Sequence, residues 1–81
     1  MKLPRDLSGA QLIKALEQLG YQPARQTGSH VRLTSLLGDQ HHLTIPLHDP
    51  LRIGTLAAIL ADVASHHGMT RETLIAKLFG K

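Results

Sequence analysis

Cysteine is absent from this 81-residue chain, which excludes disulfides, thiolate nucleophiles and cysteine-based zinc or iron–sulfur sites. Phenylalanine, tyrosine and tryptophan are almost absent as well, with only Tyr21 and Phe79. This disfavours proteins that stack successive bases of a single strand on aromatic platforms. No apolar run approaches the roughly 18–20 residues of a membrane span and no basic-then-apolar leader opens the chain, so we expect a cytoplasmic protein without a membrane segment.

Length and charge bound the size of the protein and the kind of partner it takes. A chain of 81 residues supports one small core, so we expect a single domain over residues 1–81. The formal net charge is +3, and six histidines add positive charge on mild acidification. A basic surface favours an anionic partner, of which nucleic acid bound through its phosphates and shape is the obvious example.

The helical spacing of apolar residues predicts three helices. The first covers residues 8–19, with Ser8 as its N-cap. The second runs from residue 53 or 55 to residue 65. A short third helix follows Thr70, which is a suitable N-cap.

Alternating apolar and polar residues predict three strands between the first two helices. These strands cover residues 21–27, 30–36 and 42–48. Gly28 suits the first turn because a short connection often requires a positive φ angle, and Gly38-Asp39 is typical of the second turn. The short connections make all three strands antiparallel.

The same alternation assigns the strand side chains to two faces. The expected inward residues are Val31, Leu33, Leu43, Ile45 and Leu47. The expected outward residues are His30, Arg32, Thr34, His42, Thr44, Pro46 and His48. An apolar sheet face must be covered, so we predict an α+β fold in which the two long helices pack side by side on one face of the sheet. The other face then carries His30 and Arg32.

Three motifs, in this order, resemble the HicA toxins, small bacterial ribonucleases that pair with a HicB antitoxin. They are Gly28-Ser29-His30 opening the second predicted strand, Ile45-Pro46-x-His48 ending the third, and Arg52-x-Gly54-Thr55-Leu56 with Ile59-Leu60 opening the second long helix. The resemblance covers nearly the whole chain. It implies a fold like that of double-stranded RNA-binding domains, cleavage of messenger RNA with His30 as the catalytic residue, and inhibition by a HicB-like antitoxin that covers this site. Family members often carry a lysine where this chain has Thr27.

The chemistry of RNA cleavage is consistent with a catalytic His30. RNA carries its own nucleophile, the 2′-hydroxyl, so a ribonuclease that uses no metal ion needs a base, an acid and positive charge near the phosphate. Imidazole suits acid–base work because its ordinary pKa of about 6.5 lies near working pH. Arg25 and Arg32 are candidates for holding phosphate oxygens, and the small residues Gly28 and Ser29 would let an RNA backbone approach. No metal ion or cofactor is expected.

The other histidines leave a second acid–base group open. His41, His42 and His48 lie on or near the third predicted strand. We favour His48 as a substrate-binding residue, although it could equally be a strand-end residue bonded to the following loop. The pairs His41-His42 and His66-His67 lack metal-ligand spacing, and we expect them to be solvent-exposed polar residues.

Two other functions remain open from the sequence. A non-catalytic double-stranded RNA-binding module would use the same basic face and would tolerate loss of the His30 imidazole. A protein whose main role is to engage its antitoxin and shift the DNA-binding state of that partner would not need RNA at all.

Overall fold

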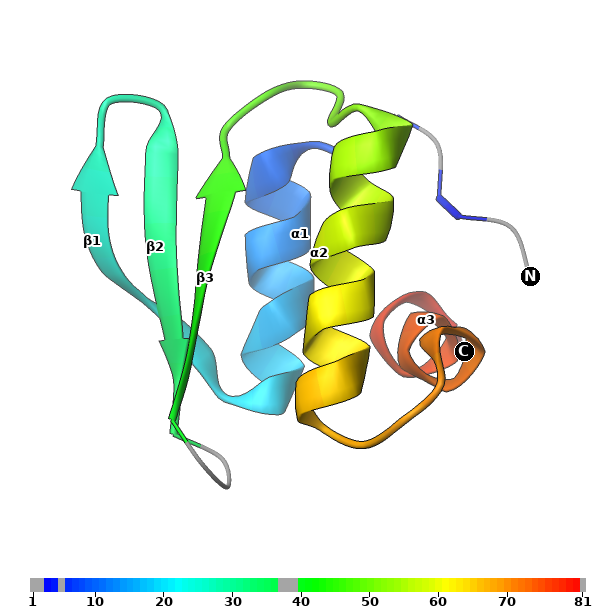
Figure 1. The fold of residues 1–81 in the computed structure, drawn as a ribbon. Helices are drawn as coiled ribbons and strands as arrows, with labels where there is room; N and C mark the ends of the chain where they lie inside the picture. Colours follow the sequence, from blue (N-terminus) through cyan, green and yellow to red (C-terminus); the bar gives the residue numbers. More distant parts are fainter. Residues whose placement is uncertain (1–2, 5, 37–39, 81) are drawn as a thin grey trace.

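The computed structural model describes residues 3–4, 6–36 and 40–80, and it shows a three-stranded sheet with helices on one side (Figure 1). The elements in chain order are α1 (Gly9–Leu16), the 3₁₀ turn η1 (Glu17–Leu19), β1 (Tyr21–Thr27), β2 (His30–Ser35), β3 (His41–Pro46), α2 (Ile53–His66) and α3 (Arg71–Phe79). This order confirms the predicted α+β fold. The turn predicted at Gly38-Asp39 lies outside the described residues.

The sheet is antiparallel with the strands in chain order, β1-β2-β3. The register places His30 opposite Thr27 on one side and opposite Pro46 on the other. Between Pro23 and Arg25 the ladder of β1 shifts register. Proline has no N–H to donate to a ladder, so such an irregularity on an edge strand is where it is tolerated.

The ends of α1 follow from its sequence. At its start, the Ser8 hydroxyl accepts from the Gln11 backbone N–H at 3.1 Å, and the Gln11 side chain accepts from the Ser8 N–H at 2.9 Å. This reciprocal capping satisfies two backbone donors that the helix leaves unpaired. The α-helix ends at Leu16, three residues earlier than predicted, because residues 17–19 tighten into a 3₁₀ turn. Gly20 then adopts a left-handed φ of 79° and directs the chain into β1.

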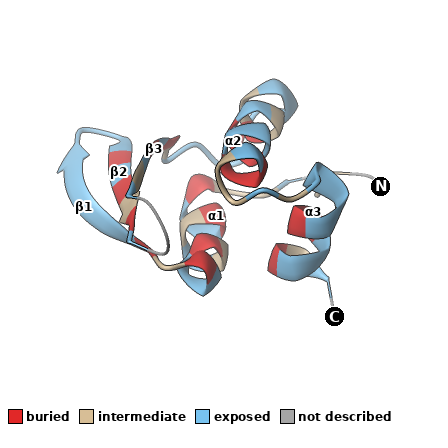
Figure 2. Ribbon diagram, turned by 60° about the horizontal axis from the view of Figure 1, so that its bottom comes forward, coloured by how far each residue is buried: buried red, intermediate tan, exposed pale blue. Residues whose placement is uncertain are grey.

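One apolar cluster joins the inner face of the sheet to the three helices. Its fully buried members include Leu33 and Ile45 from the sheet, Leu12 from α1 and Leu60 from α2. Figure 2 shows the buried residues on β2, α1 and α2, whereas β1 is exposed along nearly its whole length. In Figure 1, α3 packs against α1 and α2 on the side away from the sheet. No helix in the described part of the chain combines the length and the apolar character that crossing a membrane requires.

Two predictions about side chains were wrong. Leu47 does not face inward: it lies one residue past the end of β3 and is 37% exposed. Pro46 ends the strand, and the Leu47 N–H instead donates to the Ser29 carbonyl at 2.6 Å. His41, His66 and His67 are also not simple exposed polar residues. All three are half-buried: His41 and His67 lie within hydrogen-bond distance of the buried Tyr21 hydroxyl, and the His66 ring stacks on that of His41.

Candidate active site

A shallow depression of about 260 Å³ lies on the open face of the sheet, away from the helices. The register explains which side chains meet there. His30 lies between β1 and β3 with Thr27 opposite it, and Arg32 has Arg25 on one side and Thr44 on the other. The lining residues are Arg25, Thr27, His30, Arg32 and Thr44. Three strands therefore contribute one imidazole, two guanidinium groups and two hydroxyl groups to a single site.

The turn before His30 leaves the site open to a large ligand. Gly28 adopts a φ of 57°, and no atom lies within 4 Å of the position that a Cβ would occupy there. Gly28, Ser29 and His30 are all exposed. The Ser29 carbonyl is bonded to the Leu47 N–H at 2.6 Å, which ties the turn to the segment that follows β3. His30 is thus accessible to solvent while its backbone is held in the sheet.

The positive charge of the depression comes from Arg25 and Arg32. They are cross-strand partners in the β1–β2 register, and both are exposed. Like charges directly opposite each other in a sheet are unfavourable. Neither guanidinium is paired with a carboxylate in the described part of the chain. An anion bound between the two would relieve their repulsion, and a phosphate matches the bidentate donors of a guanidinium.

Residues 9–65 match the family model described as HicA toxin of bacterial toxin-antitoxin. The chain belongs to the HicA toxin family. It is therefore related to the toxins of bacterial toxin–antitoxin systems, as the motifs in its sequence predicted. The match includes α1, the three strands and nearly all of α2. The depression around His30 therefore lies within the region that matches the HicA family model. Comparison with curated proteins and with solved structures gave no match.

Two of the predicted site residues of this HicA-family chain carry an imidazole, His30 and His48. His48 does not line the depression. It is exposed, follows β3 by two residues and is not among the lining side chains. Its carbonyl accepts from the Gly9 N–H at 2.9 Å, which anchors the segment to the start of α1. His48 therefore lies outside the depression, and its backbone has a structural contact.

Thr27 and Thr44 line the depression but were missed as site residues by sequence reasoning. Each lies opposite a residue that was identified: Thr27 opposite His30, and Thr44 opposite Arg32. Threonine on an exposed strand face is common, so residue type gave no signal. The exact pairing of the strands was the missing information, since it determines which side chains share one face at one level of the sheet.

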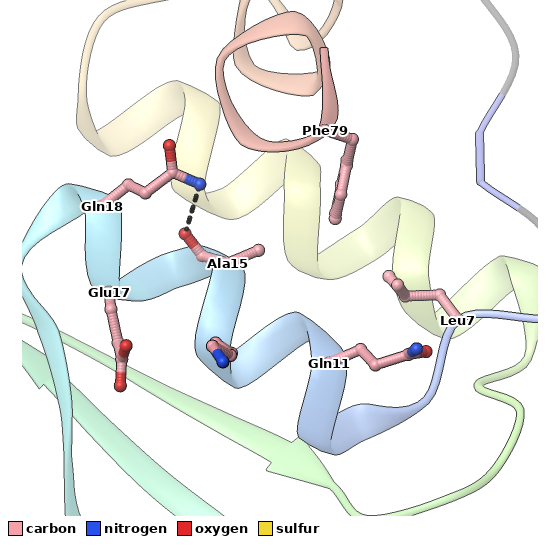
Figure 3. A pocket seen from close by; sticks show the side chains of 7 residues that line it. Leu7, Gln11, Ala15, Glu17, Gln18 and Phe79 are labelled. Carbon is pink, nitrogen blue, oxygen red and sulfur yellow. Dashed lines mark hydrogen bonds between the residues drawn. The ribbon is translucent and has the colours of Figure 1, made fainter. Parts of the chain in front are cut away.

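A larger hollow of about 640 Å³ lies between α1 and α3 (Figure 3). Its lining residues are Leu7, Gln11, Lys14, Ala15, Glu17, Gln18 and Phe79. The Gln18 amide crosses one end and donates to the Ala15 and Leu78 carbonyls, both at 3.2 Å. Its lining contains a single basic side chain and no imidazole, so it offers less for phosphate chemistry than the depression on the sheet.

Proposed function

We propose that this HicA-family chain is an endoribonuclease, an mRNA interferase, that cleaves messenger RNA in the bacterial cytoplasm with His30 as its acid–base residue. The proposal treats residues 1–81 as one domain and requires no metal ion or cofactor. The observation that supports it is the common placement of the His30 imidazole with the two guanidinium groups of Arg25 and Arg32 in one depression. These are the group types that phosphate cleavage by a 2′-hydroxyl requires.

The reaction follows from the groups at hand. The His30 imidazole takes the proton of the RNA 2′-hydroxyl, the 2′-oxygen forms a bond to phosphorus, and the bond from phosphorus to the 5′-oxygen breaks. The departing 5′-oxygen takes up a proton from solvent and the protonated His30 returns its proton to solvent, so the products are a 2′,3′-cyclic phosphate and a free 5′-hydroxyl. One positioned acid–base group typically accelerates such a proton transfer by about 10²- to 10⁴-fold.

Arg25 and Arg32 have a separate role in this proposal. Negative charge develops on the non-bridging phosphate oxygens as the new bond forms, and fixed guanidinium donors stabilise it. The hydroxyls of Thr27 and Thr44, at the same level of the sheet, add hydrogen-bond partners for phosphate or ribose oxygens. Gly28 and Ser29 admit the RNA backbone.

His48 has a separate role in this proposal. Because it is exposed beyond the end of β3 and does not line the depression, it would bind RNA outside the depression.

A HicB-like antitoxin is the partner that we propose for this surface. The depression is basic, so a surface that covers it should be acidic or polar. Association with such a partner should weaken as salt concentration rises. A complex in which His30 stays exposed to solvent would contradict inhibition by coverage of the site.

Expression in a bacterial host tests the proposed function. The wild-type chain, His30→Ala and His42→Ala are induced separately, and growth and the integrity of a reporter mRNA are followed. His42 is a matched control because it is also an exposed histidine on this face of the sheet, where it bonds Thr34 at 2.9 Å outside the depression. We expect growth arrest with cleaved mRNA for the wild type and His42→Ala, and neither for His30→Ala. Equal arrest by all three variants would exclude His30 as the acid–base residue.

The alternative is a non-catalytic double-stranded RNA-binding module. The open sheet face favours it because two exposed arginines provide phosphate contacts without any chemistry. If wild type and His30→Ala are both harmless and bind duplex RNA with similar affinity, this alternative is the correct one. Binding of the antitoxin without any RNA binding would instead indicate a protein that acts only on its partner.

A further inference from the structure

Three histidines and one tyrosine form a second titratable cluster, which the proposed RNA site does not use. The Tyr21 hydroxyl lies 2.6 Å from His41 Nδ1 and 3.0 Å from His67 Nε2. The rings of His41 and His66 stack at a centroid distance of 4.1 Å and an angle of 9°. His41 Nε2 also lies 3.3 Å from Asp62 Oδ1. Among the described residues, no group of three histidine, cysteine, aspartate or glutamate side chains has metal-binding geometry.

The cluster connects three elements that are far apart in the sequence. Tyr21 is the first residue of β1, His41 is the first residue of β3, and His66 and His67 lie at the C-terminal end of α2. Ser35 pairs with both Tyr21 and His41, so the cluster lies at the opposite end of β2 from His30. It therefore fastens the end of α2 to the sheet, at a distance from the proposed RNA site.

The supply of hydrogen-bond donors and acceptors limits the number of protons that the cluster holds. The Tyr21 hydroxyl has one proton to donate, and its side chain is fully buried. With one neutral imidazole, that proton bonds to the bare nitrogen of either His41 or His67. If both imidazoles are protonated, both nitrogens are donors and the phenol proton has no acceptor. Leaving such a buried donor unpaired is unfavourable.

The electrostatic surroundings of His67 also disfavour a second positive charge in the cluster. Burial, followed by the proximity of His66 and His41, lowers the pKa of His67. Among the described residues, Asp62 is the acidic group that faces the cluster: it lies beside His41, and its side chain is 59% exposed. Because that carboxylate lies beside His41, His67 is the imidazole of the cluster whose charged form is disfavoured by burial and by its histidine neighbours.

We propose that the Tyr21, His41, His66 and His67 cluster is an acid-sensitive latch. Near neutral pH the cluster holds the C-terminal end of α2 against the sheet. Protonation of both His41 and His67 releases that end. The direction with pH follows from linkage: the unfolded chain binds the His67 proton more readily than the folded chain does, so stability is complete above about pH 6.5 and falls as pH decreases below it. The latch does not depend on the proposed RNA cleavage.

The test measures the urea-unfolding equilibrium constant at pH 7.5 and at pH 5.0 for the full chain. Tyr21 is the only tyrosine and tryptophan is absent, so intrinsic fluorescence reports on the cluster itself. For one imidazole with an ordinary unfolded pKa, the folding equilibrium constant should fall by up to about 30-fold over this interval. The variant His67→Gln keeps an amide at the position of Nε2 but cannot take up a proton, and it should lose most of this fall. The matched control His42→Gln, at an exposed histidine outside the cluster, should keep the wild-type dependence.

Two results would overturn the latch. The first is a wild-type pH dependence that persists in His67→Gln. The second comes from NMR of the wild-type chain, which also serves if His67→Gln does not fold. We expect the His67 ring to protonate together with changes in the Tyr21 ring signals and in the amide signals of residues 64–67. Protonation of His67 at or above an ordinary imidazole pKa, with the Tyr21 signals unchanged, would show that the cluster is not a latch.

Discussion

Replacing Gly9 by alanine would force a methyl carbon into the backbone at the end of β3. A Cβ atom at Gly9 would lie 2.0 Å from the Pro46 carbonyl oxygen and 3.1 Å from the Leu47 Cα atom. Non-bonded heavy atoms in favourable contact are about 3.5 Å apart or more, so α1 or the end of β3 must move by at least about 1 Å. Pro46 pairs with His30, so this movement reaches the proposed site through one step of the ladder.

Opposing effects decide the size of the change. Helix propensity alone favours alanine over glycine by up to about 1 kcal/mol. Overpacking costs about 1–3 kcal/mol, and weakening the 2.9 Å hydrogen bond from the Gly9 N–H to the His48 carbonyl costs about 1 kcal/mol more. The net prediction is a loss of about 1–3 kcal/mol in the free energy of unfolding. Gly54→Ala is the matched control in the first turn of α2: no atom lies within 4 Å of that Cβ position, so propensity acts alone and we expect a gain of up to about 1 kcal/mol.

Urea unfolding followed by circular dichroism measures both variants. For a domain of this size each kcal/mol corresponds to a shift in Tm of about 4–8 °C. A Gly9→Ala chain as stable as the wild type would refute the close packing of α1 on the end of β3. A loss of stability in Gly54→Ala equal to that in Gly9→Ala would show that the effect is not the contact with Pro46.

Three further predictions concern charge, a buried hydroxyl and alkaline pH. Arg32→Gln should weaken RNA binding and lower the slope of log affinity against log salt by about 0.7 for each single-strand phosphate that is no longer neutralised. Arg71→Gln, at an exposed position at the start of α3, should change neither the affinity nor the slope. Filter binding at several salt concentrations measures both quantities. Ser35→Ala removes the buried hydroxyl that donates to the Leu19 carbonyl at 2.9 Å. The variant should lower the free energy of unfolding, measured in urea, by about 1–2 kcal/mol. An unchanged value would contradict a stabilising role for this hydrogen bond. Burial and then Asp62 raise the pKa of Tyr21 to about 12, so phenolate absorbance should titrate near that value in the folded chain. The pKa of Tyr21 is higher in the folded chain than in the unfolded chain, so stability present below pH 10 is lost as pH rises from about 10 towards 12. A titration midpoint near 10 for Tyr21 in the folded chain would contradict the effect of burial.

The fold was predictable because local signals agreed along the chain. Ser8 and Thr70 cap helices as predicted, and Gly20 and Gly28 adopt the positive φ angles that their turns require. The alternation around Val31 assigned the faces of β2 correctly. Each of these features depends on a few neighbouring residues, so a single sequence is enough to find them.

The errors came from contacts between distant segments. The burial of His41 depends on Tyr21 and on the end of α2, and nothing near His41 in the sequence indicates this. Leu47 continues an alternating pattern, but Pro46 had already ended the ladder. Thr27 joined the candidate site only once the strand register was known. Periodicity identifies faces, whereas the partners on a face are set by tertiary packing.

Cleavage of RNA by His30 can be measured on the purified chain. Single-turnover cleavage of a single-stranded RNA, and binding of the same RNA, are measured for the wild type and for His30→Ala. We expect products with 2′,3′-cyclic phosphate ends for the wild type. The variant His30→Ala should bind with nearly unchanged affinity and cleave at least about 100-fold more slowly. A DNA strand of the same sequence, which lacks the 2′-hydroxyl, should stay intact. Cleavage by His30→Ala at the wild-type rate, or cleavage of the DNA, would exclude a reaction in which His30 activates the 2′-hydroxyl.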